Sequence, residues 1–243
     1  MLHKVTASDT AKTPQERLAE IQTKIKDLFE DPLYVELFNA KCHDSGEPVS
    51  LEAAKLFKED LLKRNVKAST TLNLHSMRLG INSMIALSNS IHLRKCVEKL
   101  NLGDNSITDY GMHSVKNIVR NCGQHLKALN LASNMVSGSG FELFIEELCA
   151  NESLKHLDLG VIESSMRKNS LGVQGAACLA TLLRKNKVLE SLSVGDNDLG
   201  PDGGQALGQA LAHNSTLRTL KVSENDLKSE GAIPIIQNAY HLD

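Results

Sequence analysis

One pattern is repeated six times between residue 69 and the end of the chain, and it restricts the fold more than any other feature. Each copy has the form Leu-x-x-Leu-x-Leu-x-x-Asn-x-Leu, with glycine or serine four residues further on. Successive copies begin 28, 29, 28, 35 and 28 residues apart, at Ser69, Val97, Leu126, Leu154, Leu189 and Leu217. A period of about 20 to 50 residues is typical of solenoids, in which each unit packs only against its neighbours.

The fourth and sixth positions of the repeat are aliphatic in all six copies. A spacing of two residues places both side chains on one face of an extended strand, so the pattern predicts short parallel strands with a shared apolar face. The ninth position is asparagine in five copies and Met77 in the first. A carboxamide there can satisfy backbone groups that the turn after the strand leaves unpaired.

The second half of each copy predicts a helix. Apolar side chains four and eight residues after the glycine or serine lie on one helix face, as Val115 and Val119 do in the second copy. The fourth copy is longer than the others by seven residues, which we place as an insertion at 161–167.

These copies resemble the leucine-rich-repeat family, in particular its ribonuclease-inhibitor-like class, whose repeats have this length and a full helix. The resemblance covers about 69–243 and is carried by NESLKHLDL (151–159), NKVLESLSV (186–194) and NSTLRTLKV (214–222). It implies an α/β solenoid shaped like a horseshoe, with a parallel β-sheet on the concave face and α-helices on the convex face. We therefore expect a leucine-rich-repeat domain with six repeats over residues 66–243.

Residues 13–65 predict a helical N-terminal extension and cap, and residues 1–12 are expected to be flexible. The first helix is expected at 14–30, because Thr13, Pro14 and Glu16 form a capping box with a proline in the first turn. This helix is interpreted as part of the cap, and docking onto a partner is the alternative.

A short apolar segment follows at 33–38, and a second helix is expected from Ser50 to about Arg64. The spacing of Leu62 and Asn65 matches that at the helix ends of later copies, so this helix predicts the outer half of an incomplete repeat that shields the first one. The C-terminal end shows no comparable cap. We expect either that its last residues are enough to cover the end of the core, that another protein covers that end, or that the chain continues.

Composition and charge argue against several functional classes. The net charge is −2, which disfavours a nucleic-acid partner or an electrostatic role at a membrane surface. No stretch is long and apolar enough to span a bilayer, and the N-terminus has no apolar signal core. The five cysteines are odd in number and widely spaced, so we expect reduced thiols in a cytoplasmic protein, with a cytoskeletal or ciliary location implied by the resemblance.

Outward-facing strand positions define the expected concave surface. The small residues that follow most strands either let a partner approach closely or relieve crowding on a curved sheet. The candidate protein-binding residues on this face are Asn73, His75, Asn101, Asn130, His156, Asp158 and Lys221.

The rim that follows the strands becomes acidic toward the C-terminus, with Asp196, Asp198, Glu224 and Asp226 as candidate contacts. This cluster is either a solvated surface or a site that steers a partner with a basic surface. The insertion is expected to project from the same rim, and its candidate contacts are Arg167 and Lys168. A solenoid can also tolerate such an insertion without using it.

The sequence predicts no catalytic, cofactor-binding or metal-binding residues. It contains no glycine-rich phosphate loop, no zinc-protease helix and no paired cysteines at metal-binding spacing. Cys122 is interpreted as a small packed apolar group rather than a nucleophile.

These features predict a non-enzymatic scaffold for protein–protein interaction that uses the concave face and rim. The resemblance implies a subunit of a larger hetero-oligomeric assembly, of a cytoskeletal, axonemal or signalling kind. The alternative is a GTPase-activating protein or regulator of a small GTPase, because the Ran GTPase-activating proteins share this repeat class. The chain lacks their long acidic tail, so the scaffold is the preferred interpretation.

Overall fold

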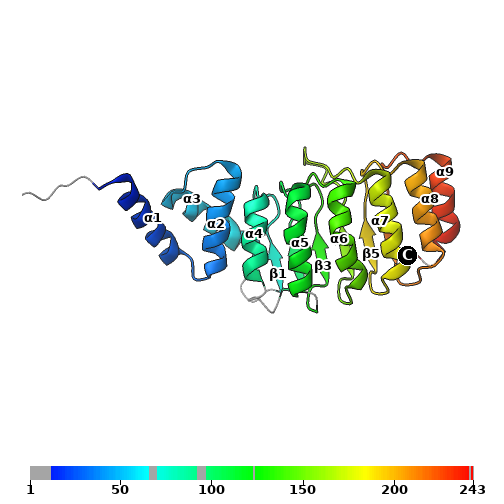
Figure 1. The fold of residues 1–243 in the computed structure, drawn as a ribbon, viewed down its shortest axis with the longest axis horizontal. Helices are drawn as coiled ribbons and strands as arrows, with labels where there is room; N and C mark the ends of the chain where they lie inside the picture. The colour runs from blue at the N-terminus through cyan, green and yellow to red at the C-terminus, as the bar shows by residue number, and fades with distance from the viewer. Residues whose placement is uncertain (1–11, 66–69, 92–96, 123, 241, 243) are drawn as a thin grey trace, which may run out of the picture.

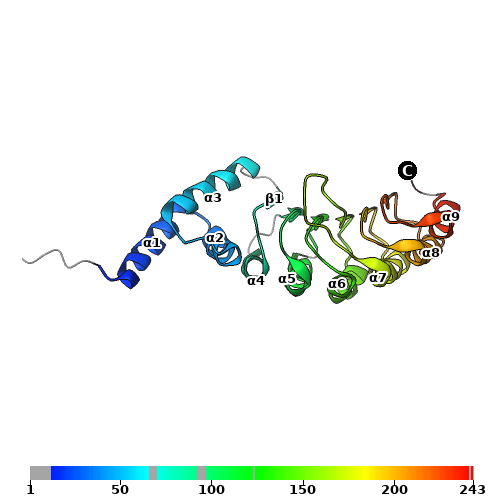
Figure 2. The same cartoon turned by 90° about the horizontal axis from the view of Figure 1, so that it is seen from above.

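The computed structural model describes residues 12–65, 70–91, 97–122, 124–240 and 242. They form an elongated, curved body with three helices at one end and alternating strands and helices over the rest (Figure 1). The strands lie along the inner side of the curve and the later helices along its outer side (Figure 2). The predicted flexibility of residues 1–12 concerns a segment that, apart from Lys12, lies outside the described residues.

Within the described residues, six parallel strands of three residues each form one sheet in the order of the sequence. They are β1 (Thr71–Asn73), β2 (Lys99–Asn101), β3 (Ala128–Asn130), β4 (His156–Asp158), β5 (Ser191–Ser193) and β6 (Thr219–Lys221). In β1 to β5 the central leucine is buried and its two neighbours are more exposed, as alternation along a strand requires. The strands are aligned without offset, so equivalent residues form continuous columns across the sheet.

One helix follows each strand on the convex side (Figure 2). These helices are α4 (Ile81–Ser90), α5 (Thr108–Cys122), α6 (Gly138–Ala150), α7 (Gly172–Lys185), α8 (Gly200–Leu211) and α9 (Lys228–Asn238). Their apolar faces and the strand leucines share one core. The predicted α/β solenoid, with a parallel sheet inside and helices outside, is confirmed.

The ninth-position asparagine satisfies backbone groups of two neighbouring turns, as predicted. Oδ1 of Asn105 accepts hydrogen bonds from two amides of the preceding repeat, and Nδ2 donates to carbonyls of both repeats, at 2.8 to 3.2 Å. Asn134, Asn169 and Asn225 make similar bonds. Among the described residues, Oδ1 of Asn197 has no partner, so this series of asparagine hydrogen bonds is interrupted one repeat after the insertion.

In the described part of the chain before the first strand, the helices are α1 (Pro14–Leu28), α2 (Pro32–Ser45) and α3 (Leu51–Arg64). The predicted capping box is present, since Thr13 Oγ1 accepts from the amide of Glu16, and the Glu16 carboxylate accepts from the amide of Thr13. The apolar segment at 33–38 lies within a full helix, which was not predicted from the sequence. That helix is capped by Asp31 and ends at Gly46 in the left-handed conformation.

α2, rather than α3, packs beside α4 on the convex side (Figure 2). The prediction that the helix starting after Ser50 is the outer half of an incomplete repeat is therefore wrong. The carboxylate of Asp44 in α2 caps α4 by accepting hydrogen bonds from the amides of Gly80, Asn82 and Ser83 at 2.8 to 2.9 Å. Burial raises the pKa of Asp44, but the hydrogen bonds from Ser83 and Asn82 outweigh it and hold the pKa below its usual value.

α3 instead covers the free edge of β1 with two side chains from its C-terminal end. Asn65 donates from Nδ2 to the carbonyl of Asn73 at 3.0 Å and accepts from the amide of Asn73 at 2.7 Å. Nη1 of Arg64 donates to the carbonyl of His75 at 2.7 Å. The equivalent carbonyls of β2 accept hydrogen bonds from the preceding repeat. Arg64 and Asn65 therefore take the place of a preceding strand at an edge that would otherwise be open.

Candidate functional site

The concave side of the sheet holds a shallow depression of about 360 Å³ that crosses all six strands. The aligned register brings the fifth repeat positions into one column across it, formed by Asn73, Asn101, Asn130, Asp158, Ser193 and Lys221. His156 also lines the depression. The structure thus brings six of the candidate residues onto one surface.

The first three side chains of this column have a fixed orientation. Oδ1 of Asn73, Asn101 and Asn130 accepts a hydrogen bond from the backbone amide two residues further on, at 3.2, 3.1 and 2.8 Å respectively. Each Nδ2 group has no hydrogen-bond partner among the described residues. We call these three side chains the donor column, because the groups they leave unused are N–H donors.

At two positions beside the column, a residue larger than glycine would press closely on its neighbours. A Cβ at Gly103 would lie 3.1 Å from Oδ1 of Asn130 and 3.3 Å from Oδ1 of Asn101. A Cβ at Gly160 would lie 3.1 Å from Oγ of Ser193. Of the two interpretations of this row, relief of crowding therefore has direct structural support.

The insertion at 161–167 rises on the concave side and folds back over the rim of earlier repeats (Figure 2). Asp104 in the second repeat accepts hydrogen bonds from Ser76 Oγ at 2.7 Å, from Arg167 Nη1 at 3.2 Å and from Ser165 Oγ. We call Asp104, Ser165 and Arg167 the clasp. Arg167, a candidate contact, is thus engaged within the protein.

Burial raises the pKa of Asp104, but the hydrogen bonds from Ser165, Ser76 and Arg167 outweigh it and keep the pKa below its usual value. The carboxylate of the clasp therefore stays charged at neutral pH and holds the Arg167 guanidinium.

Two further contacts fix the insertion. The amide of Ile162 donates to Ser133 Oγ at 2.8 Å. A Cβ at Gly103 would lie 3.1 Å from Cδ1 of Ile162, so the insertion borders the concave face beside the donor column. Met166 is fully exposed near the end of the insertion.

Part of the acidic rim is neutralised within the protein. Nζ of Lys168 lies 2.6 Å from Oδ1 of Asp196 and 3.2 Å from Oδ1 of Asp198. Hydrogen bonds to Asp196 and Asp198 raise the pKa of Lys168. Glu224 is exposed without an ion pair among the described residues, and Asp226 lies 4.0 Å from a neighbouring lysine. Three of the four candidate carboxylates therefore already have a cation, although the contact of Asp226 is long and exposed.

Backbone conformation accounts for part of this acidic composition. Asp104, Asp196, Asp198 and Asp226 all have positive φ values, between 48° and 56°. Aspartate tolerates the left-handed region better than most residues do. The turn after each strand thus favours aspartate independently of any partner.

The two candidate histidines do not form a pair. His156 is exposed on β4, whereas His75 is half-buried beyond the end of β1, with two strands between them. No group of three or more His, Cys, Asp or Glu side chains in the described part of the chain could hold a metal ion. Cys122 is buried in the core, which agrees with its interpretation as a packed apolar group, and burial raises the pKa of its thiol to about 11. Within the same residues, no helix has the length and apolarity needed to cross a membrane.

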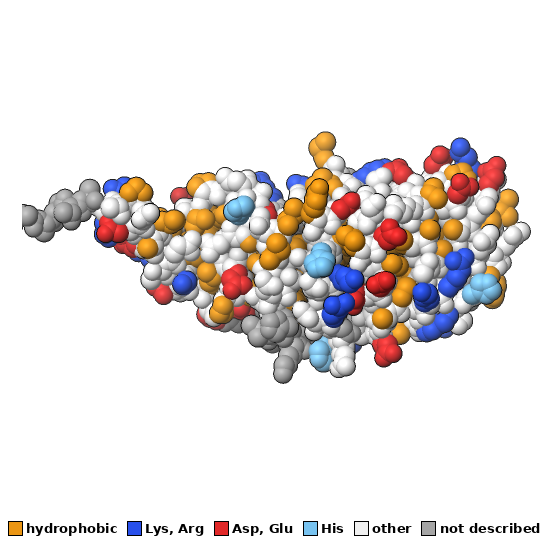
Figure 3. Space-filling view, viewed as in Figure 1, with side chains coloured by type: hydrophobic (Ala, Val, Ile, Leu, Met, Phe, Trp, Pro, Cys, Tyr) orange, Lys and Arg blue, Asp and Glu red, His pale blue; other side chains and the backbone are white. Residues whose placement is uncertain are grey.

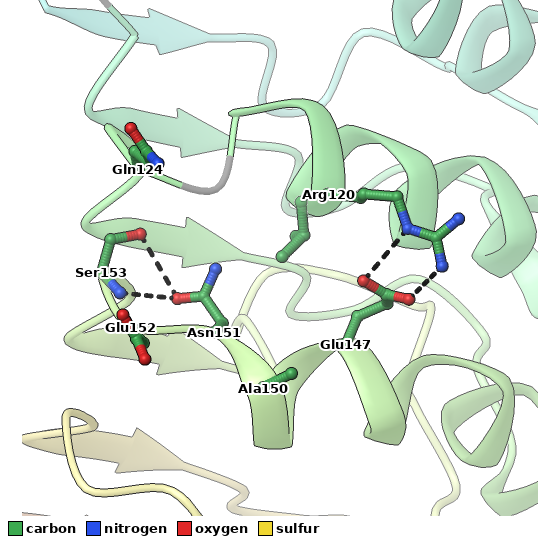
Figure 4. A pocket seen from close by; sticks show the side chains of 8 residues that line it. Arg120, Gln124, Glu147, Ala150, Asn151, Glu152 and Ser153 are labelled. Carbon is green, nitrogen blue, oxygen red and sulfur yellow. Dashed lines mark hydrogen bonds and ion pairs between the residues drawn. The ribbon is translucent and has the colours of Figure 1, made fainter.

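A second hollow, of about 400 Å³, lies near the C-terminal ends of α5 and α6 (Figure 4). Arg120 and Glu147 form an ion pair across it, with Nε 3.3 Å from Oε2. Oδ1 of Asn151 accepts from the amide of Ser153 at 2.9 Å. This hollow could not be predicted from the repeat pattern, because Arg120 and Glu147 are 27 positions apart and lie outside the repeat motif. Two pairs of its polar side chains, Arg120 with Glu147 and Asn151 with Ser153, are thus engaged with each other.

The convex face carries positive and negative side chains without separation into patches (Figure 3). Lys and Arg side chains lie among Asp and Glu side chains over the helices (Figure 3). Exposed hydrophobic residues occur on separate helices, at Ile85, Leu143 and Val173. The concave face differs from the convex face because its first three strands carry the carboxamide donors of the donor column.

A family model described as "Leucine Rich repeat" matches residues 95–115, 185–208 and 213–235. The curated proteins include no match to the chain. Among solved structures, the chain is similar to "Leiomodin-1 Actin-Binding Site 2 (ABS2)", with 14% identity and a TM-score of 0.44 over 76% of this chain and 88% of that chain. Each segment matched by the family model contains one strand and the start of its helix, and the same unit occurs six times. The chain is a leucine-rich-repeat protein.

Proposed function

We propose that this protein is a non-enzymatic scaffold that binds a protein partner through its concave face. The donor column carries the proposal, because three adjacent carboxamides on one sheet have unused donors among the described residues. Leucine-rich-repeat domains generally bind proteins, which supports the same assignment.

The insertion adds a second element to the proposed surface. The clasp and the Ile162–Ser133 hydrogen bond hold it against the rim, so a partner would not have to order it on binding. Met166 then offers an exposed apolar side chain beside a polar surface. We expect Met166 to contact an apolar group of the partner.

We further propose that the protein is a cytoplasmic subunit of a hetero-oligomeric assembly of a cytoskeletal, axonemal or signalling kind. Exposed Ile233 and Ile236 on α9 support an additional contact. The earlier expectation of a basic partner loses support, because Lys168 already pairs with Asp196 and Asp198. None of the described residues favours the GTPase-activating alternative.

The proposal can be tested by quantitative affinity capture from a cell lysate. The concave variant Asn101→Met/Asn130→Met, which removes two donors without adding charge, is compared with the wild-type protein and with a convex control, Asn89→Met/Asn121→Met. The control makes the same chemical change at exposed positions on α4 and α5. We expect the concave variant to lose proteins that the wild-type and the control both retain, with all three melting cooperatively. Equal capture by all three would refute the proposal.

A further inference from the structure

We propose that the concave face of β1 to β3 recognises an acidic peptide segment. In this interaction, carboxylates and carbonyl oxygens of the segment accept hydrogen bonds from the donor column, and one carboxylate pairs with Lys99. The inference rests on the proposed function and specifies the chemistry of the partner.

The orientation of the donor column is the first argument. A free asparagine side chain can present either its oxygen or its nitrogen to a ligand. In Asn101, Oδ1 is held by the amide of Gly103 at 3.1 Å, and a reversed carboxamide would place two donors against each other. Asn73 and Asn130 are held in the same way. The column can therefore donate to a ligand but is poorly placed to accept from one.

The charges around the column also favour an acidic ligand. The outward residues of these three strands include one cation and no acid, and they are Thr71, Asn73, Lys99, Asn101, Ala128 and Asn130. Lys99 is exposed and has no ion pair among the described residues. The adjacent Glu98 is paired with Lys127 at 2.8 Å. The first acid of the column, Asp158, lies on β4.

Within the clasp, Arg167 compensates the charge of the rim carboxylate that would otherwise repel such a segment. Asp104 follows β2 closely, but its carboxylate accepts hydrogen bonds from Ser76, Ser165 and Arg167. The insertion thus supplies a cation to the nearest rim carboxylate, and Ile162 borders the column on that side.

The dimensions suit a short peptide. Neighbouring strands lie about 4.8 Å apart, so the three donors span about 10 Å. An extended segment covers this distance in about three residues. Two or three acidic residues in close sequence would therefore meet the donor column and Lys99 together.

The test uses the intact chain and two fluorescein-labelled 12-residue peptides, one alternating Glu with Ser and one alternating Lys with Ser. Fluorescence anisotropy measures the affinity of each. The variants Asn101→Asp and Asn130→Asp replace the outward donor by a carboxylate oxygen and keep Oδ1 for the backbone amide. Asp158 makes that same bond at 3.0 Å, so the fold accepts aspartate at this position of the column. Asn121→Asp, at an exposed position of α5, is the matched charge control.

We expect the Glu–Ser peptide to bind, more weakly as salt rises, and each column variant to weaken it about tenfold while Asn121→Asp leaves it within about twofold. Absence of Glu–Ser binding, tighter binding of the Lys–Ser peptide, or an equal loss in Asn121→Asp would each overturn the inference. The lysate experiment decides the proposed function separately. Partners lost by Asn101→Met/Asn130→Met would preserve the scaffold even if the peptide preference were reversed.

Discussion

Nη1 of Arg167 lies 3.2 Å from Oδ1 of Asp104, which precedes it by 63 residues. This contact joins the insertion of the fourth repeat to the rim of the second. A residue expected to be free for a partner instead fixes the loop that carries it. The insertion therefore contributes to a surface with a set shape.

Replacing Arg167 by alanine should release the insertion while leaving the solenoid intact. Hydrogen exchange at the amide of Ile162 should become faster, because its bond to Ser133 loses the support of the clasp. The free energy of unfolding should change by no more than about 1 kcal/mol, since Arg167 is partly exposed. Lys155→Ala, which breaks the exposed pair with Glu190, is the control and should leave exchange in the insertion unchanged. Unaltered exchange in Arg167→Ala would show that the clasp does not hold the loop.

Asp44 should make stability depend on pH in the acid range. Its folded pKa is below the unfolded value of about 3.9, so its contribution is complete above that value and is lost as pH falls through the folded pKa. Asp44→Asn should lower the free energy of unfolding by about 1 kcal/mol at pH 7, because a charged acceptor becomes neutral. Urea unfolding between pH 7 and 2 should show a constant difference above about pH 5 that shrinks below about pH 4. A difference that persists to pH 2 would contradict this account.

The ninth-position asparagines should contribute unequally to the free energy of unfolding. Asn105→Ala leaves several buried amides and carbonyls without partners, and should cost about 3 kcal/mol or more. Asn197→Ala should cost less, because Oδ1 of Asn197 accepts no hydrogen bond within the described residues. Denaturant unfolding of the two variants gives the comparison. Equal losses would indicate that the interruption at Asn197 has no energetic consequence.

The sequence alone was sufficient to predict the solenoid because its information is local and repeated. Leu72 and Leu100 have the spacing that selects a strand face, and both are buried in register. The same regularity identified Asn105 as a turn residue and placed Asn101 and Asn130 on one surface. Each inference required only the position of a residue within its own repeat.

The features that sequence reasoning missed depend on distant contacts. The cap of α4 comes from Asp44, which is 36 residues before Gly80. The clasp depends on the path of a loop that no repeat position specifies. The orientation of Asn101 depends on the amide of Gly103, so a local signal was present in the sequence but its meaning required the geometry of the turn.

The central claim is that the concave face is the protein-binding surface, and site-specific photocrosslinking tests it most directly. Benzoylphenylalanine replaces Ala128, which lines the concave depression, or Ala177, which is exposed on α7. Both changes start from alanine, and Ala177 is the more exposed of the two, so a crosslink from position 128 alone could not be explained by easier access. In cells, the account predicts a crosslinked protein adduct from position 128 and none from position 177. An adduct from position 177 alone, or the same adduct from both positions, would contradict it.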